Sequence, residues 1–110
     1  MENVLIVADK VANEKVALNY ATLRRAVLTL RAINHPLRKE MMELIEAKGK
    51  ITVSELYLKM RIEQSVASQH LALLRKADVL STSRDGKFIY YSINTKRIDE
   101  IAKLVEQLAQ

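Results

Sequence analysis

Apolar side chains recur every three or four residues along much of this chain, which is the spacing of amphipathic helices. The longest stripe covers residues 9–33 and predicts either one helix or, if Asn19 or Thr22 breaks it, two. Residues 36–48 predict the next helix, because proline fits a first helical turn and disfavours helix in the residue before it. Gly49 then fits a left-handed cap at the end of that helix.

The middle of the chain alternates helical segments with a tight turn. A short helix is expected to begin at Thr52 or Val53, with Ser54 suited to its N-cap. A turn at residues 61–63 leads into a predicted helix at residues 64–76. That helix begins with small polar residues and ends with leucines, so its start suits a groove and its end suits a core.

The pattern changes to aromatic and β-branched residues at 88–93, which predicts a strand. An Asp85-Gly86 pair before it suits a tight hairpin turn, and residues 79–80 lead into the opposite strand. Helix, turn, helix and hairpin in this order predict a winged helix-turn-helix. The fold class is therefore expected to be mainly α with a small β-hairpin, with the helix-turn-helix at residues 53–76 and the wing at residues 79–94.

Length and composition fit one ordinary domain. The 110 residues are interpreted as a single winged helix domain, 1–110, and a hydrophobic content of 49% is enough for its core. The apolar runs are far shorter than the roughly 20 residues that span a bilayer, and the N-terminus lacks a secretory signal pattern. We therefore expect no membrane association and a cytoplasmic location. The absence of cysteine excludes disulfides and thiolate metal ligands.

The positive charge permits a polyanionic partner but is spread along the chain. The formal net charge is +5, of which the second helix of the predicted helix-turn-helix and the wing, residues 63–94, contribute only +1. Affinity for phosphates would therefore come from a few well-placed cations, and a dimer would help to gather them.

The start of the helix at residues 64–76 carries side chains suited to reading bases. A helix in the major groove reads base edges with residues near its N-terminus, and glutamine pairs well with adenine. The candidates here are Gln64, Ser65, Ser68 and Gln69. For the two serines, the alternative role is to cap or solvate a surface helix.

The wing supplies a second set of candidate contacts. Arg84 and Lys87 flank the turn and would reach phosphates or the minor groove, or else serve as solvated charges that deter edge pairing. Tyr90 and Tyr91 face opposite sides of their strand, so one is expected in the core and the other near a phosphate. We predict the DNA contact at Tyr91. Weaker candidates for backbone contacts are Arg38, Lys39 and Lys59.

The first and last helices offer more apolar surface than the winged domain needs. Residues 1–33 and 95–110, the latter capped by Asn94 or Thr95, are predicted to form a two-fold dimer interface. The alternative is that the two helices pack on each other within one chain. The predicted interface residues are Val16, Tyr20, Leu23, Val27, Ile98, Ile101, Val105 and Leu108.

Taken together, segments within residues 30–93 resemble the ArsR-type bacterial repressors. The matching segments are Leu30 to Arg38, Val53 to Leu56, Gln64 to Ala77, and Arg84 to Lys87 with the following tyrosines. The resemblance implies that residues 64–77 contain the recognition helix. It places His70 where the family contacts the DNA backbone or supports the helix, and the alternative for His70 is a satisfied surface histidine. It also adds Arg75 to the expected DNA contacts.

This chain departs from the metal-sensing members of that family. They use cysteines on the first helix of the helix-turn-helix, or Asp and His pairs on the last helix. Here Ser54-Glu55-Leu56-Tyr57 contains no cysteine, and the last helix has no histidine. Zinc and soft metals need such ligands in groups of three or four. We therefore expect no cofactor and no metal sensing at the known family sites.

The sequence thus predicts a cytoplasmic, homodimeric regulator, most simply a repressor, that binds an inverted-repeat operator in double-stranded DNA. An unknown small-molecule or protein effector is compatible with this function. No catalytic constellation is visible, so an enzyme is not expected. The main rival hypothesis is a winged-helix protein-interaction module without specific DNA readout. A weaker rival is a non-specific architectural DNA binder.

Overall fold

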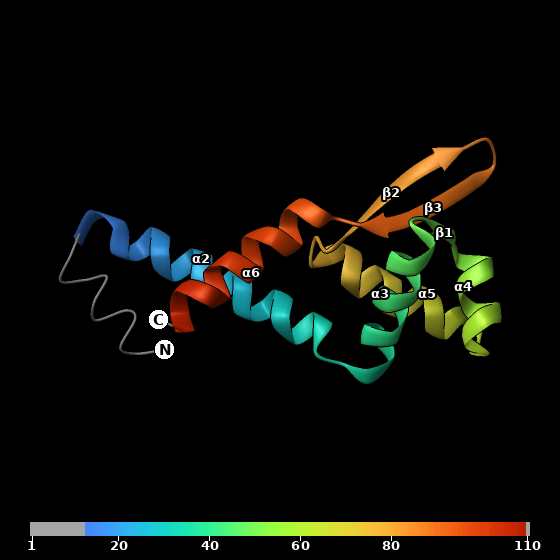
Figure 1. The fold of residues 1–110 in the computed structure, drawn as a ribbon, viewed down its shortest axis with the longest axis horizontal. Helices are drawn as coiled ribbons and strands as arrows, with labels where there is room; N and C mark the ends of the chain where they lie inside the picture. The colour runs from blue at the N-terminus through green and yellow to red at the C-terminus, as the bar shows by residue number, and fades with distance from the viewer. Residues whose placement is uncertain (1–12, 110) are drawn as a thin grey trace.

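The computed structural model describes residues 13–109, with side chains from residue 20 to residue 107. The elements in chain order are α2 (Asn13–Ile33), α3 (Pro36–Lys48), β1 (Ile51–Thr52), α4 (Val53–Met60), α5 (Gln64–Lys76), β2 (Leu80–Asp85), β3 (Phe88–Ile93) and α6 (Thr95–Ala109). The molecule is elongated, 52 × 27 × 21 Å. Helices α3 to α5 and the strands form a body at one end, from which α2 and α6 extend (Figure 1). The predicted fold class is confirmed.

Helix α2 is continuous from Asn13 to Ile33. Neither Asn19 nor Thr22 interrupts it, so the single-helix alternative is the one observed. The Thr29 side chain, only 3% exposed, donates its hydroxyl proton to the Arg25 carbonyl at 2.9 Å and thus remains hydrogen-bonded inside the helix. The start of this helix expected near residue 9 lies outside the described residues.

The junction between α2 and α3 has the predicted position at His35-Pro36. His35 has an extended backbone, and its Nδ1 accepts a hydrogen bond from the Leu37 N–H at 3.1 Å, so it caps α3 with its side chain. Pro36 occupies the first helical turn, where its missing N–H costs nothing. At the other end of α3, Gly49 has φ 81° and ψ −54°. The glycine cap is confirmed in its positive φ, but its conformation is not left-handed helical.

A short strand that the sequence pattern did not predict precedes α4. Strand β1 pairs antiparallel with β3, with Ile51 opposite Tyr91 and Thr52 opposite Tyr90. The sheet therefore has three strands in the order β1-β3-β2. Thr52 is also the N-cap of α4, because its hydroxyl oxygen accepts a hydrogen bond from the Glu55 N–H at 3.2 Å. The prediction of Ser54 as the cap was wrong, since Ser54 already lies inside the helix.

The wing is a regular two-stranded hairpin. Strands β2 and β3 pair from Leu80 opposite Ile93 to Asp85 opposite Phe88. Gly86 and Lys87 are therefore the two loop residues, and the expected Asp85-Gly86 turn is displaced by one position. Gly86 has φ 62°, the sign that a type II′ turn requires at its first central residue.

The core lies between α3, α4, α5 and the sheet. Its buried members are Met41, Ile45, Ile51, Leu56, Ala67, Leu71, Leu74, Val79 and Leu80. Helix α5 contributes three of these residues, and burial of that apolar face fixes the helix against the rest of the body.

Asn94 connects the end of the wing to α6. Its side-chain amide donates to the Asp78 carbonyl at 2.9 Å, and its Oδ1 accepts from the Arg97 N–H at 3.3 Å. Of the two predicted caps, Asn94 is the residue that makes the capping bond. Through these bonds the start of α6 is fixed to the chain segment that precedes β2.

Candidate nucleic-acid interface

Helix α5 presents a polar face to solvent over its first two turns. Its core-facing side chains are Ala67, Leu71 and Leu74. The four base-reading candidates are exposed, and they are Gln64, Ser65, Ser68 and Gln69. At 100° per residue these four side chains occupy roughly 140° of the helix circumference. Ser65, Ser68 and Gln69 are turned away from the core, and Gln64 lies at the edge of the core-facing side. The structure thus brings together the four residues that the sequence singled out.

The turn before α5 fixes the angle between the two helices. Arg61 adopts a left-handed conformation, φ 57° and ψ 43°, and ends α4, while the Ile62 N–H donates to the Tyr57 carbonyl at 3.1 Å. Glu63 precedes α5 and makes no side-chain capping bond to the described residues. The first N–H groups of α5 therefore stay available to an anion such as a phosphate.

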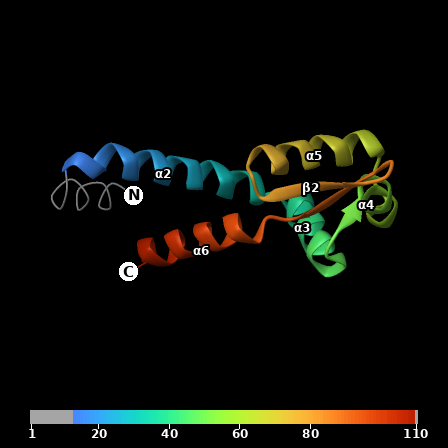
Figure 2. The same cartoon turned by 90° about the horizontal axis from the view of Figure 1, so that it is seen from above.

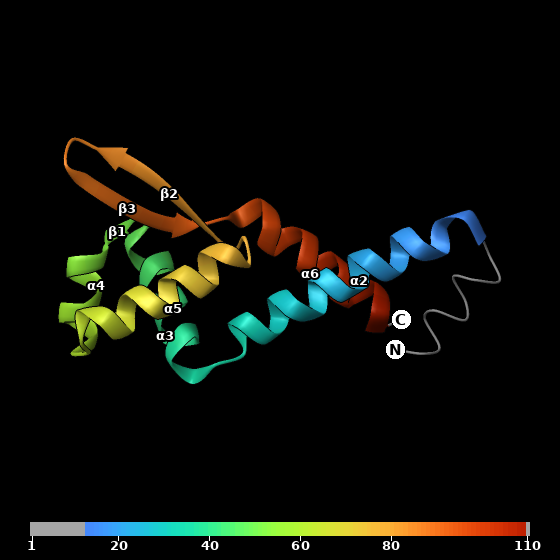
Figure 3. The same ribbon diagram turned by 180° about the vertical axis from the view of Figure 1, so that it is seen from behind.

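The wing tip lies at the same end of the molecule as the start of α5. Figure 3 shows α5 in the foreground, with its N-terminal end beside α4 and the hairpin tip above, both remote from α2 and α6. Arg84 and Lys87 are exposed at that tip. Arg84 Nε donates to the Gly86 carbonyl at 3.2 Å, which holds the guanidinium close to the turn.

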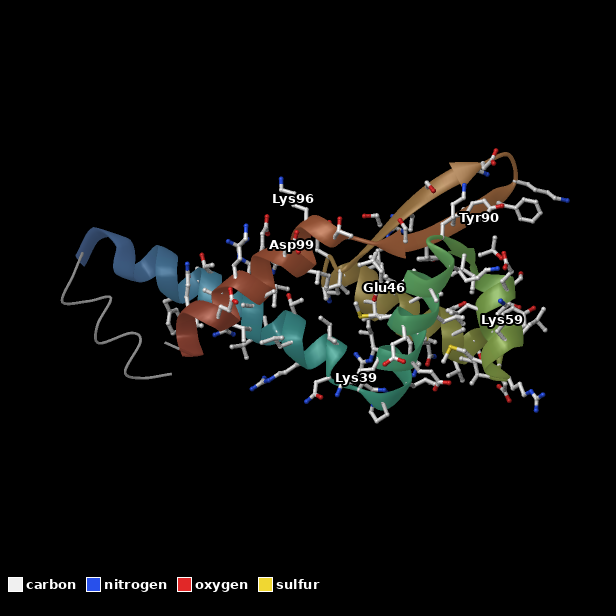
Figure 4. The ribbon with its side chains drawn as sticks, viewed as in Figure 1. Lys39, Glu46, Lys59, Tyr90, Lys96 and Asp99 are labelled. Carbon is white, nitrogen blue, oxygen red and sulfur yellow. The ribbon has the colours of Figure 1, made fainter. Side chains whose placement is uncertain are left out.

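The two wing tyrosines have different surroundings. Tyr91 packs against the hydrophobic core, although we predicted it as the DNA contact. Tyr90 lies on the other face of β3, where the Lys50 ammonium stands 4.6 Å from its ring centroid (Figure 4). Tyr90 is therefore the better placed of the two for a phosphate contact.

Two residues of this surface were not among the site residues predicted from the sequence. Lys50 follows the α3 cap and has no motif of its own, and Phe88 is half exposed beside Lys87, whose ammonium lies 5.4 Å from the ring centroid. Phe88 and Tyr90 are on one face of β3, with ring centroids 6.5 Å apart. A basic group next to exposed aromatics on a strand was the signal available for Phe88; nothing in the pattern marked Lys50.

His70 lies on the opposite side of α5 from the polar face. It is half-buried, and its ring centroid is 4.9 Å from that of His35. Burial, His35 and Arg38 together lower the pKa of His70. The structure therefore places His70 in the packing between α5 and the start of α3, apart from the base-reading candidates.

The remaining cations are dispersed. Arg75 is exposed on the same side of α5 as Gln64, about 16 Å further along at 1.5 Å per residue. Lys59 is exposed on α4, and Lys39 is exposed at the start of α3 (Figure 4). Arg38 is half-buried, with its Nε fully buried. None of these four joins the cluster at the start of α5.

Helices α2 and α6 lie side by side away from the body, as Figures 1 and 2 both show. Arg97 of α6 donates from Nη2 to the Thr29 hydroxyl of α2 at 3.2 Å. Leu23 and Ile101 are 6% and 5% exposed, so these two predicted interface residues are already buried within one chain. The alternative of packing within one chain is thus observed for part of the apolar surface.

Other predicted interface residues have different environments. Tyr20 and Val105 remain exposed, Val27 is half-buried, and Ile98 packs against the core. The side chains of Val16 and Leu108 lie outside the described ones. Exposed apolar surface therefore persists on both helices after they pack together.

Two classes of site find no support in the described part. No three His, Asp or Glu side chains within it come together as they would around a metal ion. None of its helices has the length and apolar composition to cross a membrane.

Comparison with known proteins shows consistent matches. Residues 35–82 match the family described as "Bacterial regulatory protein, arsR family". The biofilm growth-associated repressor of Agrobacterium fabrum is 36% identical over 97 residues, which covers 88% of this chain and 74% of that protein. The transcriptional repressor PagR of Bacillus anthracis is 30% identical over 91 residues, covering 83% and 91% of the two chains.

Solved structures agree with the observed fold. The crystal structure of PagR has a TM-score of 0.67 at 31% identity, covering 78% of this chain and 98% of that one. A homodimeric winged helix-turn-helix DNA-binding domain from Mycobacterium bovis has a TM-score of 0.68 at 22% identity, covering 83% of each chain, and supports the fold alone. On these matches, the chain belongs to the arsR family of bacterial regulatory proteins.

Proposed function

We propose that this protein is a homodimeric transcriptional repressor that reads an inverted-repeat operator in double-stranded DNA. The main supporting observation is the set of exposed polar side chains at the start of α5, which lies at the same end of the molecule as the basic wing tip. A convex helix with short polar side chains fits the major groove, and a flanking hairpin fits the adjacent backbone or minor groove. The relatives cited above are named as repressors. A protein with this role would have to be located in the cytoplasm, where a bacterial cell holds its chromosome.

Each element has its own part in this proposal. Gln64, Ser65, Ser68 and Gln69 would contact base edges, with Gln69 and Gln64 able to pair with adenine. Arg84 and Lys87 would contact phosphates or the minor groove, and Tyr90 with Lys50 would contact the backbone beside the wing. The free N–H groups at the start of α5 favour a phosphate at that point. We leave His70 and Tyr91 out of the contact set because both pack into the body.

The proposed dimer uses the apolar surface that remains on α2 and α6. Tyr20, Val27 and Val105 belong to these helices, which extend away from the body (Figure 1). A two-fold axis through this region would hold the two copies of α5 outward on either side. Successive major grooves on one face of DNA are about 34 Å apart, so two copies at that spacing would read an operator with matching symmetry.

Selection from a random pool of double-stranded DNA at about physiological salt tests the proposal. We expect an enriched inverted repeat whose half-sites are about 10 base pairs apart. A Ser68→Ala, Gln69→Ala double variant should lose the enrichment, and Lys96→Ala, an exposed change on α6, should retain it (Figure 4). Failure of folded wild-type protein to enrich any sequence would contradict direct readout.

A second candidate function is a protein-interaction module. One observation favours it: Phe88 and Ile89 are 49% and 50% exposed next to the wing turn, which places apolar surface where DNA contact alone would not need it. The DNA selection separates the two candidates, because an interaction module would give no enriched sequence.

A further inference from the structure

A groove of about 670 Å³ lies where the C-terminal end of α5 meets α2 and α6. We refer to it as the joint groove. Part of its wall is apolar, formed by Leu28 and Ala32 of α2 and Leu73 of α5. The polar part combines Thr29 with charged residues from four segments of the chain, namely Arg25, Arg38, Lys76, Asp78, Arg97 and Glu100.

Positive charge dominates the joint groove. Its four cations face two carboxylates, and one of these, Glu100, is 3.5 Å from Arg97 Nη1. The Nε atoms of Arg38 and Arg97 are buried and have no hydrogen-bond partner among the described residues. These two buried N–H donors thus lack partners, while the groove carries two more cations than carboxylates. An anion in the groove would offset that excess positive charge.

We propose that the joint groove binds a small organic anion, one that carries a carboxylate or similar group on a compact apolar body. The apolar part would lie against Leu28, Ala32 and Leu73, and the anionic group would face the arginines. Guanidinium groups pair with carboxylates through two parallel hydrogen bonds, which favours a planar anionic head. A bulky polyanion is disfavoured by Asp78 and Glu100, which also line the groove.

The position of the joint groove would make such a ligand regulatory, an extension that rests on the proposed DNA-binding function. Leu73 and Lys76 belong to α5, while Arg25 and Arg97 belong to the two helices of the proposed dimer region. A ligand that bridges α5 and these two helices would favour one orientation of α5 relative to α2. Bound DNA would favour the orientation that fits its grooves. Ligand and DNA would therefore change each other's affinity.

The groove also stays accessible in the proposed dimer. At 100° per residue, Arg25, Leu28 and Ala32 lie on a different side of α2 from Tyr20 and Val27. A partner on the Tyr20 side therefore leaves the groove side of α2 open to solvent.

Titration calorimetry of the full chain with 1-naphthoate, without DNA, tests the site. We expect one naphthoate per chain, and binding roughly tenfold weaker or more for the uncharged 1-naphthalenemethanol. Arg25→Gln and Lys76→Gln should each weaken naphthoate binding by roughly tenfold. Both side chains are exposed, so these variants should fold. Arg31→Gln removes the same charge from α2 outside the groove and should leave binding unchanged.

The contrary results are equally definite. Absence of naphthoate binding, equal binding of the alcohol, or equal loss in Arg25→Gln and Arg31→Gln would overturn the site. Ala32→Leu, which fills the apolar wall without changing charge, should also abolish binding. Because no DNA is present, these outcomes are independent of whether the operator selection succeeds. Unchanged operator affinity at saturating naphthoate would overturn the regulatory extension.

Discussion

The imidazole rings of His35 and His70 lie against each other, with centroids 4.9 Å apart and planes tilted by 47°. His35 caps α3 through its Nδ1, and His70 belongs to α5, so the contact joins the start of one helix to the side of the other. The His70 Nδ1 is buried without a hydrogen-bond partner among the described residues. Added positive charge at this contact is therefore unfavourable.

This contact predicts acid sensitivity of the fold. Burial, His35 and Arg38 hold the pKa of His70 below its ordinary value of 6.5, so between 6.5 and that lower value the unfolded chain binds a proton that the folded chain does not. The free energy of unfolding should consequently fall as pH drops below about 6.5. His70→Gln should reduce that fall, measured by urea unfolding between about pH 7 and pH 5.5. An equally steep fall in both proteins would contradict this assignment.

Adjacent leucines on α5 should differ sharply in their contribution to stability. Leu74 is fully buried and Leu73 is 46% exposed. Leu74→Ala should lower the free energy of unfolding by about 2–5 kcal/mol, because it leaves a cavity in the core. Leu73→Ala, the matched control, should cost less than about 1 kcal/mol. Chemical denaturation of both variants checks the packing of α5. Similar losses of unfolding free energy in the two variants would contradict the burial of Leu74 and the exposure of Leu73.

Gly86 should be required for its backbone conformation alone. Its φ is 62°, and an added Cβ would meet no atom of the described residues within 4 Å. Gly86→Ala should therefore destabilise the protein by about 1 kcal/mol through backbone strain. Gly86→Asn should cost less, since asparagine tolerates positive φ. Thermal unfolding compares the two variants, and equal losses would argue against strain at the turn.

Base readout and phosphate contact should be separable by mutation. Gln69→Ala should lose about 1–3 kcal/mol of discrimination at one base position of the operator. Arg84→Ala should instead weaken binding to all sequences and reduce the slope of log affinity against log salt by about one. Binding titrations on operator variants at several salt concentrations distinguish these effects. Uniform weakening by Gln69→Ala would remove it from the reading set.

The proposed dimer should be sensitive to charge on the exposed apolar surface of α6. Val105→Glu places a carboxylate there, so dissociation is expected at micromolar concentration, measured by sedimentation equilibrium. Lys96→Gln changes the net charge by the same amount near the start of α6 and should leave the mass unchanged (Figure 4). A wild-type mass of one chain, or an unaffected Val105→Glu mass, would contradict this interface.

Elements with strong local signals were predicted well from the sequence. Pro36 and the apolar period that follows it define α3, and the aromatic and β-branched run defines β3. Strand β1 was not predicted because two residues cannot show a period. The cap at Thr52 was missed for a related reason. Thr52 and Ser54 have the same capping chemistry, and pairing of β1 with β3 decides between them.

The limits at the site have a similar physical origin. Periodicity marks Leu23 and Ile101 as apolar but cannot tell whether α6 or a second chain covers them; the structure buries both within one chain. Alternation along β3 separates Tyr90 from Tyr91 without saying which side holds the core. The position of His70 could not be predicted because it depends on a tertiary contact with His35, and no local sequence pattern shows such a contact.

The pairing of β1 with β3 has a consequence for the thermodynamics of recognition. A two-stranded ribbon held only at its base would have to lose freedom on contact with DNA. Here Ile51 and Thr52 hold Tyr91 and Tyr90 at the middle of β3, and Thr52 simultaneously begins α4. The hairpin and α4, the first helix of the helix-turn-helix, are thereby ordered before any encounter. Complex formation should then carry a small entropic penalty for protein ordering, leaving discrimination between DNA sequences to the fit of a preformed surface.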